Sequence, residues 1–458
     1  MSRNGGVRAS PAQLTAEAVR LIKGDGCERN AEEAAGLLLE ASKRGFAPAQ
    51  YLLGAMLLEG DGVGRDEAGA AKWIGRAADQ GMDMAMHAMG LMCQEGVGVE
   101  KDEQKAAGWY LAAAEKGNAD AQLRIATMYS EGAGVEQSDK RAADWFEKAA
   151  EQGSAEAQRE IGTRLLLGRG REQSYEKAAE WLGLAAEQGD AAAQLALAAM
   201  HAEGLGVEQS YEEAAGWTRM AADGGSAEAQ YRMGCVCRAG TGVERSDREA
   251  ARWFGLAAEQ GHPGAQYAYG TMLAHGLGLE ADPVGSIGWF RMSAEQGNAD
   301  AQLVLGMAYD EGIGVEASHE RAAEGYLRAA LQGNADAQFN LGCAYDSGEG
   351  VGRSPGEAER WWRASAEGGN WDAQYNLGRA LAARGDPEAG EWVRRAAESG
   401  HEGARKAVEE MDKMQSAQTA RRLRHDGEGL AEQPEGTVLE VARKALQRGN
   451  VLSGFTTE

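Results

Sequence analysis

The sequence predicts an all-α protein in which about eleven helix-loop-helix repeats of 36 residues stack into a solenoid. Three observations predict this fold. Glycine recurs every 36 residues in three columns, and apolar residues within each period are spaced three or four positions apart. Residues that commonly begin helices stand before both apolar segments of most periods. No stretch alternates between apolar and polar residues with a period of two, so we expect no β-sheet.

The glycine columns define the register of the repeat. Ten consecutive units carry all three columns, and an eleventh unit, at about 370–400, has a shortened loop and ends at Gly400. The first column is Gly24, Gly60, Gly96, Gly132, Gly168, Gly204, Gly240, Gly276, Gly312 and Gly348; the second lies two residues later, from Gly26 to Gly350; the third is Gly45, Gly81, Gly117, Gly153, Gly189, Gly225, Gly261, Gly297, Gly333 and Gly369.

The sequence of each unit predicts two helices. In one unit these helices cover 119–132 and 139–153. Their apolar residues lie on one face of each helix. These residues are Ala121, Ile125, Met128 and Tyr129 in the first helix, and Ala142, Trp145, Ala149 and Ala150 in the second. One unit alone cannot bury such faces, whereas stacked units can.

Capping residues mark where the helices begin. A side-chain oxygen at the residue before the second helix can bind the free N–H groups of its first turn. These residues are Asn30, Asp66, Asp102, Ser138, Ser174, Ser210, Ser246, Asp282, Ser318 and Ser354. Glu33, Glu213, Glu249 and Glu357 stand three residues later and predict capping boxes. The first helix is usually preceded by Asn118, Ser154, Asp190, Ser226, Asn298, Asn334 or Asn370.

The recurrent glycines have two interpretations, a phosphate-binding loop or a backbone turn. A phosphate loop is needed once rather than ten times, and it requires a lysine and a serine beside it. A glycine after a helix accepts the left-handed conformation that ends the helix, which other residues adopt at a cost of about 1–2 kcal/mol. We therefore interpret the glycines as structural.

Tryptophan occupies one structural position in most units. Nine of the eleven tryptophans share it: Trp73, Trp109, Trp145, Trp181, Trp217, Trp253, Trp289, Trp361 and, in the shortened unit, Trp392. Each can bury roughly 150–250 Å² between neighbouring units, so we expect this column to be structural.

These columns resemble the Sel-one-like repeat (SLR) family, a relative of the tetratricopeptide repeats. The family pattern is an AxAQxxLGxxY helix, a GxGV loop and an AxxWxxxAAxxG helix, and residues 121–153 match it as AQLRIATMYSEGAGVEQSDKRAADWFEKAAEQG. The resemblance covers about 11–400 and implies a right-handed α/α superhelical solenoid with a concave groove. It further implies a role as an adaptor or scaffold for protein complexes and implies no catalytic residue.

The predicted organisation has four parts: a flexible N-terminal arm at 1–10, the repeat solenoid at 11–400, a C-terminal capping helix at 401–425 and a loosely ordered tail with a short helix at 426–458. The first unit is degenerate, with Leu37 at the tryptophan position. In the ninth unit Gly325 replaces the tryptophan, and Tyr326 is a candidate to fill the space. Trp371 stands in an alanine column, where it either fills space beside the shortened loop or marks a contact site.

Composition excludes several classes of function. The formal net charge is −24, and such an acidic chain should repel nucleic acid and anionic lipid. No apolar run of about 18 residues exists, so we expect no membrane insertion. The start shows no signal peptide, and the five cysteines show no disulfide framework, which favours the cytoplasm.

Two short motifs suggest chemistry and are better explained by structure. Ser174 and Lys177 have the S-x-x-K spacing of a serine acylating enzyme, but Ser174 is also a predicted helix cap. Cys235 and Cys237 are spaced so that their thiols point in different directions on a helix, and Cys237 falls in the buried column of Tyr129, so we favour core packing over a metal site. We therefore expect no catalytic, metal-binding or cofactor-binding residue.

Variable positions of the first helices are the candidate partner-binding surface. Repeat solenoids bind partners along the face that one helix of each pair lines. The candidate groove residues are Tyr51, Arg124, Glu160, Tyr231, Arg232, Tyr267, Asn340 and Tyr375. Aromatic residues would supply affinity and the charged residues would fix the register of a bound segment. The alternative is that these positions are solvated surface and contacts between units.

These features predict a non-catalytic, monomeric scaffold or adaptor that binds other proteins or peptides along the solenoid groove. The alternatives are a secreted bacterial effector and a hydrolase-linked repeat protein. A unique polar constellation outside the repeat register would favour an enzyme, and the sequence shows none.

Overall fold

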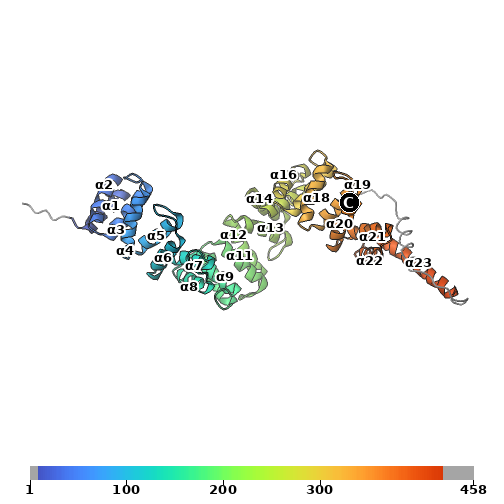
Figure 1. Cartoon of the computed structure of the whole chain (residues 1–458), viewed down its shortest axis with the longest axis horizontal. Helices are drawn as coiled ribbons and strands as arrows, with labels where there is room; N and C mark the ends of the chain where they lie inside the picture. The colour runs from blue at the N-terminus through green and yellow to red at the C-terminus, as the bar shows by residue number, and fades with distance from the viewer. Residues whose placement is uncertain (1–8, 426–458) are drawn as a thin grey trace, which may run out of the picture. The chain divides into compact units, whose positions relative to one another are not determined.

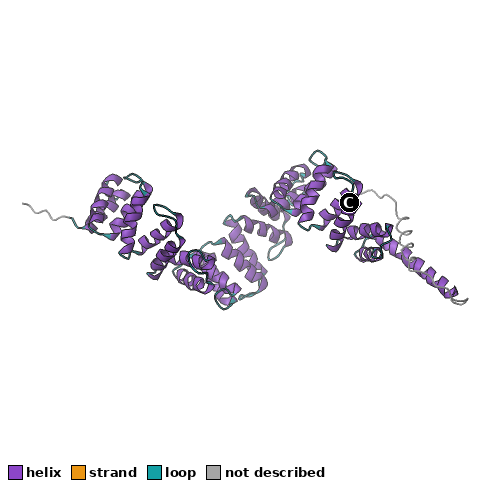
Figure 2. Cartoon of the chain, viewed as in Figure 1, coloured by secondary structure: helices purple, strands orange, loops and turns teal. Residues whose placement is uncertain are grey.

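The structure, a computed structural model, describes residues 9–425 and is all-α throughout that range, as predicted (Figure 2). The predicted ends at 1–8 and 426–458 lie outside the described residues. The chain divides into two compact units, which comprise residues 1–229 with 241–243, and residues 230–240 with 244–458. Figure 1 labels the helices in chain order.

Successive helices alternate between the first and second helix of a repeat. The first unit contains α1 (Pro11–Lys23), α2 (Ala31–Lys43), α3 (Ala47–Glu59), α4 (Glu67–Asp79), α5 (Asp83–Glu95), α6 (Glu103–Glu115), α7 (Ala119–Glu131), α8 (Asp139–Glu151), α9 (Ala155–Leu167), α10 (Tyr175–Glu187), α11 (Ala191–Glu203) and α12 (Tyr211–Asp223). Helix α13 (Ala227–Ala239) spans the division. The second unit continues with α14 (Asp247–Glu259), α15 (Pro263–His275), α16 (Pro283–Glu295), α17 (Ala299–Glu311), α18 (His319–Leu331), α19 (Ala335–Ser347), α20 (Pro355–Glu367), α21 (Trp371–Ala383), α22 (Ala389–Glu398) and α23 (Glu402–His425).

Each helix packs against its neighbours in the chain. In the first compact unit successive helices contact each other from α1 to α12, and in the second compact unit they do so from α14 to α23. Because these contacts join helices that follow one another in the chain, stability is the sum of repeat and interface contributions rather than the product of one central core. This is the architecture of an all-α solenoid.

The predicted caps of the second helices are confirmed. Ser138 Oγ accepts a hydrogen bond from the backbone N–H of Arg141, and the other nine predicted caps act in the same way. The capping boxes predicted at Glu213, Glu249 and Glu357 are wrong, as is the one at Glu33, because the backbone N–H of the cap already has a partner. Ser210, for example, donates to the carbonyl of His201 in the preceding helix at 2.9 Å.

The two glycines of each loop, from the first and second columns, have different structural roles. Gly132 ends α7 with φ 77°, the left-handed conformation that the sequence predicted. Gly134 also has a positive φ, of 68°, but it lies against α6 of the preceding repeat, where an added Cβ would stand 2.2 Å from the carbonyl oxygen of Glu103. The second glycine of the loops from Gly62 to Gly350 is therefore required by close packing against the preceding repeat, a reason that the sequence did not show; Gly26, in the first repeat, has no such contact.

The largest fully buried side chains are not the tryptophans but the aromatic residues that come directly after them in the sequence. Tyr110, Phe146 and Phe254 each stand one residue after a tryptophan and are almost completely buried. In the tryptophan column, Trp253, Trp361 and Trp392 are buried, whereas Trp73, Trp109, Trp145, Trp181, Trp217 and Trp289 are half-buried. The outer face of several indoles carries a cation; Lys148 Nζ, for example, lies 3.8 Å from the ring centroid of Trp145.

Candidate peptide-binding groove

The predicted groove residues all lie on first helices of the repeats. In the first unit, Tyr51 is on α3, Arg124 on α7 and Glu160 on α9. The second unit holds the remaining five: Tyr231 and Arg232 on α13, Tyr267 on α15, Asn340 on α19 and Tyr375 on α21. Arg124 and Arg232 are exposed, and the other six are half-buried.

The structure brings two of these residues together in one open hollow. Tyr231 and Tyr267 both line a groove of about 600 Å³ between α13 and α15. Its other walls are Cys235, Arg238, Ala239, Arg245, Phe254, Gly264, Ala268 and Thr271. Arg232, Asn340 and Tyr375 are not among the lining residues, so the hollow contains two of the five candidates in the second unit.

Ring contacts fix the orientation of both tyrosines. Tyr231 stacks on His262 with ring centroids 4.6 Å apart and meets Phe254 at 5.8 Å. Tyr267 meets Phe290 at 5.9 Å. Side chains held in this way lose little conformational entropy when a ligand binds, so they are suited to act as anchors.

The charged groups that line the groove are cationic. Arg238 and Arg245 line it, and Arg245 forms a loose ion pair with Asp247 at 4.0 Å. Burial is the main cause that raises the pKa of Tyr267, and the nearby Asp300 carboxylate adds to it. Tyr267 therefore stays a neutral phenol at physiological pH. The groove combines aromatic faces with guanidinium groups in a chain whose formal net charge is −24, and it suits a peptide that carries apolar and acidic side chains.

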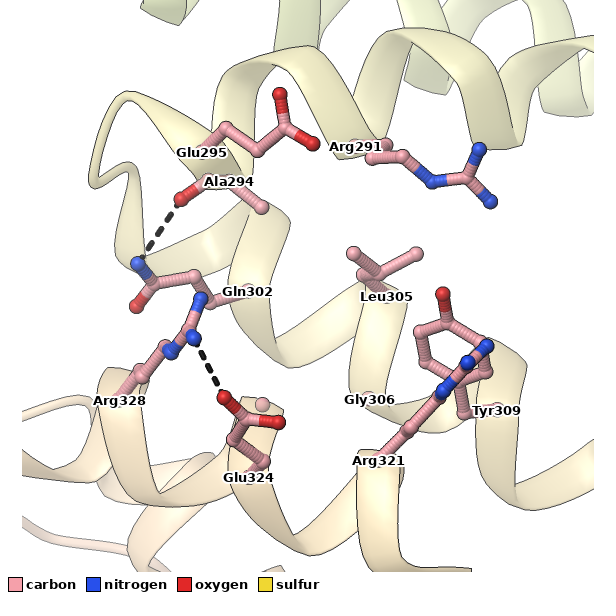
Figure 3. A pocket seen from close by; sticks show the side chains of 11 residues that line it. Arg291, Ala294, Glu295, Gln302, Leu305, Gly306, Tyr309, Arg321, Glu324 and Arg328 are labelled. Carbon is pink, nitrogen blue, oxygen red and sulfur yellow. Dashed lines mark hydrogen bonds and ion pairs between the residues drawn. The ribbon is translucent and has the colours of Figure 1, made fainter. Parts of the chain in front are cut away.

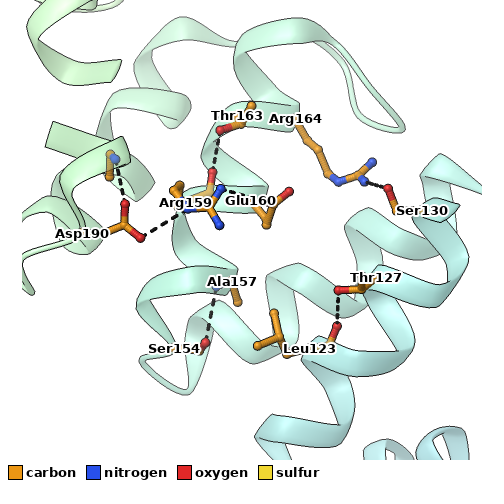
Figure 4. Close-up of polar contacts among 11 residues, drawn as sticks. Leu123, Thr127, Ser130, Ser154, Ala157, Arg159, Glu160, Thr163, Arg164 and Asp190 are labelled. Carbon is orange, nitrogen blue, oxygen red and sulfur yellow. Dashed lines mark hydrogen bonds and ion pairs between the residues drawn. The ribbon is translucent and has the colours of Figure 1, made fainter. Parts of the chain in front are cut away.

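In the first compact unit, the candidate Glu160 already forms an ion pair within the protein. Figure 4 shows Arg159 of α9 between two carboxylates, with its Nη1 2.7 Å from Glu160 and its Nε 3.3 Å from Asp190. A partner would have to compete with Arg159 for Glu160, which makes Glu160 a weaker candidate than the exposed Arg124.

Sequence reasoning missed Arg164 of α9, a charged side chain that is only 6 % exposed. Its Nη1 lies 3.0 Å from Asp139, its Nη2 donates to Ser130 Oγ, and its guanidinium sits 5.1 Å from the ring of Phe146. Met128 and Met200 occupy the same column in neighbouring repeats. A cation at this buried position was the signal that could have revealed this link between α9 and the preceding repeat.

The two motifs that suggested chemistry, Ser174 with Lys177 and Cys235 with Cys237, have structural explanations. Ser174 Oγ caps α10 by accepting from the backbone N–H of Lys177 at 3.4 Å. All five cysteines are thiols; Cys237 is buried as expected, and Cys235 is exposed and lines the groove. A spacing of two on a helix points the two thiols in different directions. Within residues 9–425, no three His, Cys, Asp or Glu side chains are grouped so that they could hold a metal ion.

Comparison with known proteins gives a consistent result. The family described as Sel1 repeat matches eleven consecutive segments: 18–46, 47–82, 83–118, 119–154, 155–190, 191–226, 227–262, 263–298, 299–334, 335–370 and 371–401. No curated protein matches the chain. Among the described residues, the structure contains no helix with both the length and the apolar character needed to cross a membrane.

Two solved structures share most of the chain. The crystal structure of c5321, described as a protective antigen present in uropathogenic Escherichia coli strains and displaying an SLR fold, has a TM-score of 0.77 and 29 % identity, and covers 98 % of this chain and 97 % of its own. A Sel1 repeat protein from Oxalobacter formigenes has a TM-score of 0.51 and 30 % identity, and covers 81 % of this chain and 93 % of its own.

Proposed function

Because the chain belongs to the Sel1-repeat family, we propose that it is a non-catalytic scaffold that binds a segment of another protein along the first helices of its repeats. The observation that carries this proposal is the open groove between α13 and α15, where Tyr231 and Tyr267 present fixed rings beside Arg238 and Arg245. Repeat solenoids commonly use such continuous helix faces to hold extended or helical peptides.

The groove residues suggest how a peptide would bind. An apolar or aromatic side chain of the peptide rests between Tyr231 and Tyr267, and a carboxylate of the peptide pairs with Arg238 or Arg245. Buried aromatic anchors of this kind each contribute about 2 kcal/mol or more to binding, whereas charges at the rim mainly steer association and fix the register.

The proposal includes the setting of the protein. All five cysteines are thiols, which favours a reducing compartment and hence the cytoplasm. The acidic surface argues against nucleic acid as the partner. We propose a monomer whose partners are other proteins.

The test uses the full chain with a matched control. Partners captured from the native cell are identified by mass spectrometry, and the strongest is purified and titrated against wild type, the Tyr231→Ala/Tyr267→Ala variant and the Tyr375→Ala variant. Tyr375 stacks on His401 at 4.3 Å, as Tyr231 stacks on His262, but it lies outside the groove. We expect the double variant to lose at least about tenfold in affinity and Tyr375→Ala to bind normally. Equal binding by all three proteins would remove the groove from the proposal.

A second candidate function is that of an exported bacterial protein. It is favoured by the likeness to c5321, which is described as a protective antigen of uropathogenic strains. Fractionation of the native cell, with detection of the intact protein in the cytoplasmic, surface and secreted fractions, separates the two candidates.

A further inference from the structure

The ninth repeat lacks the tryptophan that its neighbours carry. Gly325 of α18 stands in the column of Trp289 and Trp361, 36 residues away on either side. A hollow of about 230 Å³ lies beside Gly325, between α16, α17 and α18 (Figure 3). Tyr326, the sequence's candidate to fill this space, does not line the hollow. Its side chain is instead buried in the core, with its hydroxyl 3.3 Å from Asp310.

The walls of the hollow correspond to the residues that hold an indole one repeat earlier. Trp289 packs against a cluster that includes Ala258 and meets Tyr269 edge to face, with ring centroids 5.2 Å apart. Adding one repeat of 36 residues to these two positions gives Ala294 and Leu305, and both line the hollow. The space beside Gly325 is therefore the space that a tryptophan side chain occupies in the neighbouring repeats.

The backbones and side chains around this space are already fixed by contacts within the protein. An added Cβ at Gly325 would lie 3.0 Å from the carbonyl oxygen of Gln302 and 3.1 Å from Cα of Gly306, so α18 and α17 touch through their backbones. Gln302 is fixed in turn, because its Nε2 donates to the carbonyl of Ala294 at 3.1 Å and its Oε1 accepts from Gln332 at 2.8 Å. A binding site that is formed in advance loses little conformational entropy when a ligand binds.

The rim of the hollow gives the chemistry of the occupant. Three arginines and two glutamates line it, so its formal charge is +1 in a chain of net charge −24. Arg328 is paired with Glu324 at 2.5 Å. The guanidinium of Arg321 lies 5.5 Å from the ring centroid of Tyr309, and Arg291 extends from α16 above them in Figure 3. An aromatic ring here gains cation contacts, and a neighbouring carboxylate meets guanidinium groups.

We propose that the hollow beside Gly325 is a socket for an indole or similarly flat aromatic side chain, which a partner protein presents next to an acidic residue. The socket is separate from the groove of α13 and α15. One repeat along, the groove positions of α15 would correspond to 300, 303, 304 and 307 on α17, whereas the socket uses Gln302, Leu305, Gly306 and Tyr309. The two sites therefore lie on different faces of a first helix, and neither depends on the other.

The experiment fills the socket with the protein's own side chains. The probe is the peptide acetyl-Asp-Trp-Asp-amide carrying 5-fluorotryptophan, whose binding to the full chain is followed by fluorine NMR. Gly325→Trp places an indole in the socket and restores the pattern of the neighbouring repeats, and circular dichroism checks that this variant is folded. The matched control is Leu303→Tyr on the same helix, in a column that already contains Tyr231 and Tyr267. Leu305→Tyr is the second variant, because it reproduces the wall that Tyr269 forms beside Trp289 and leaves the socket open.

We expect wild type, Leu303→Tyr and Leu305→Tyr to bind the probe and Gly325→Trp to lose at least about tenfold in affinity. Replacement of both aspartates of the probe by lysine should weaken binding about tenfold at low salt, because it removes the attraction to Arg291 and Arg321. Binding that survives in Gly325→Trp, or that disappears in Leu303→Tyr or Leu305→Tyr, overturns the socket. If wild type self-associates and Gly325→Trp does not, a second copy is the occupant, with its exposed Trp371 beside Asp372 as the inserted ring, and the assignment to a partner protein is wrong.

Discussion

The side-chain amide of Gln152, at the end of α8, donates a 2.7 Å hydrogen bond to the amide oxygen of Gln122 in α7. Gln122 in turn donates to the carbonyl of Ala114, at the end of α6 in the preceding repeat, at 3.2 Å. One buried amide thus links three successive helices. The same pair recurs as Gln80 with Gln50, Gln188 with Gln158, Gln260 with Gln230, Gln296 with Gln266, and Gln332 with Gln302.

The glutamine pair should contribute to stability between repeats. In Gln122→Met, Gln152 loses its acceptor and the carbonyl of Ala114 loses its side-chain donor while keeping the backbone N–H of Gly117, which should cost about 1–2 kcal/mol locally. The third repeat shows a natural compensation, because it carries Met86 and Lys116 at these two positions. We expect Gln122→Met/Gln152→Lys to recover part of the loss. Hydrogen exchange of α6 and α8 measures it, and equal exchange in wild type and Gln122→Met would show that the pair is energetically neutral.

The two roles of glycine predict opposite effects of alanine. Gly134→Ala places a methyl group 2.2 Å from the carbonyl oxygen of Glu103 and forces a non-glycine residue to φ 68°, so we expect a loss of more than about 2 kcal/mol. Gly108, inside α6, has no positive φ, and a Cβ added there would meet no atom within 4 Å, so Gly108→Ala should stabilise by about 0.5–1 kcal/mol. Urea denaturation of both variants checks the difference, which a purely flexible role of Gly134 would abolish.

The repeat frame could be predicted from the sequence because a fixed period reports directly on backbone geometry. Glycine after a helix and Ser138 before the next one act on residues only a few positions away, so their effects can be inferred without knowledge of the tertiary structure. The contact between Gly134 and Glu103 joins residues 31 positions apart. Its physical basis is the packing of a loop against the first turn of α6 in the preceding repeat, which no local pattern encodes.

The candidate site could be predicted only in part, for a related reason. Column variability identified Tyr231 and Tyr267 as surface residues of first helices, but it ranked them equally with Asn340 and Tyr375. The ring contacts to His262 and Phe290 that orient the two tyrosines, and the hollow between them, depend on the packing of adjacent repeats. The loss of tryptophan at Gly325 was visible in the sequence, but the structure was needed to show that the space stays open.

Arg164 tests whether a buried charge is needed between α9 and the preceding repeat. Its partner Asp139 is half exposed, so removing the cation does not strand a buried carboxylate. Arg164→Met introduces the side chain found at Met128 and Met200 and should be neutral or slightly stabilising, whereas Arg164→Ala leaves a cavity and should cost about 2–3 kcal/mol. Thermal and urea unfolding compare the two variants. A loss in Arg164→Met as large as that in Arg164→Ala would mean that the ion pair itself stabilises the interface.

Two histidines should titrate in opposite directions from the ordinary value. A hydrogen bond to the Asp310 carboxylate raises the pKa of His319 above 6.5, whereas burial lowers the pKa of His87 below 6.5 despite the nearby Asp120. The raised pKa of His319 means that its contribution to stability is complete below pH 6.5 and is lost as the pH rises through the folded pKa. The lowered pKa of His87 means that its contribution is present above pH 6.5 and is lost as the pH falls through the folded pKa. NMR titration of the ring protons, with Asp310→Asn as the control, should give the two curves on either side of pH 6.5 and should return only His319 toward that value; a His319 curve unchanged by Asp310→Asn would exclude the carboxylate as the cause.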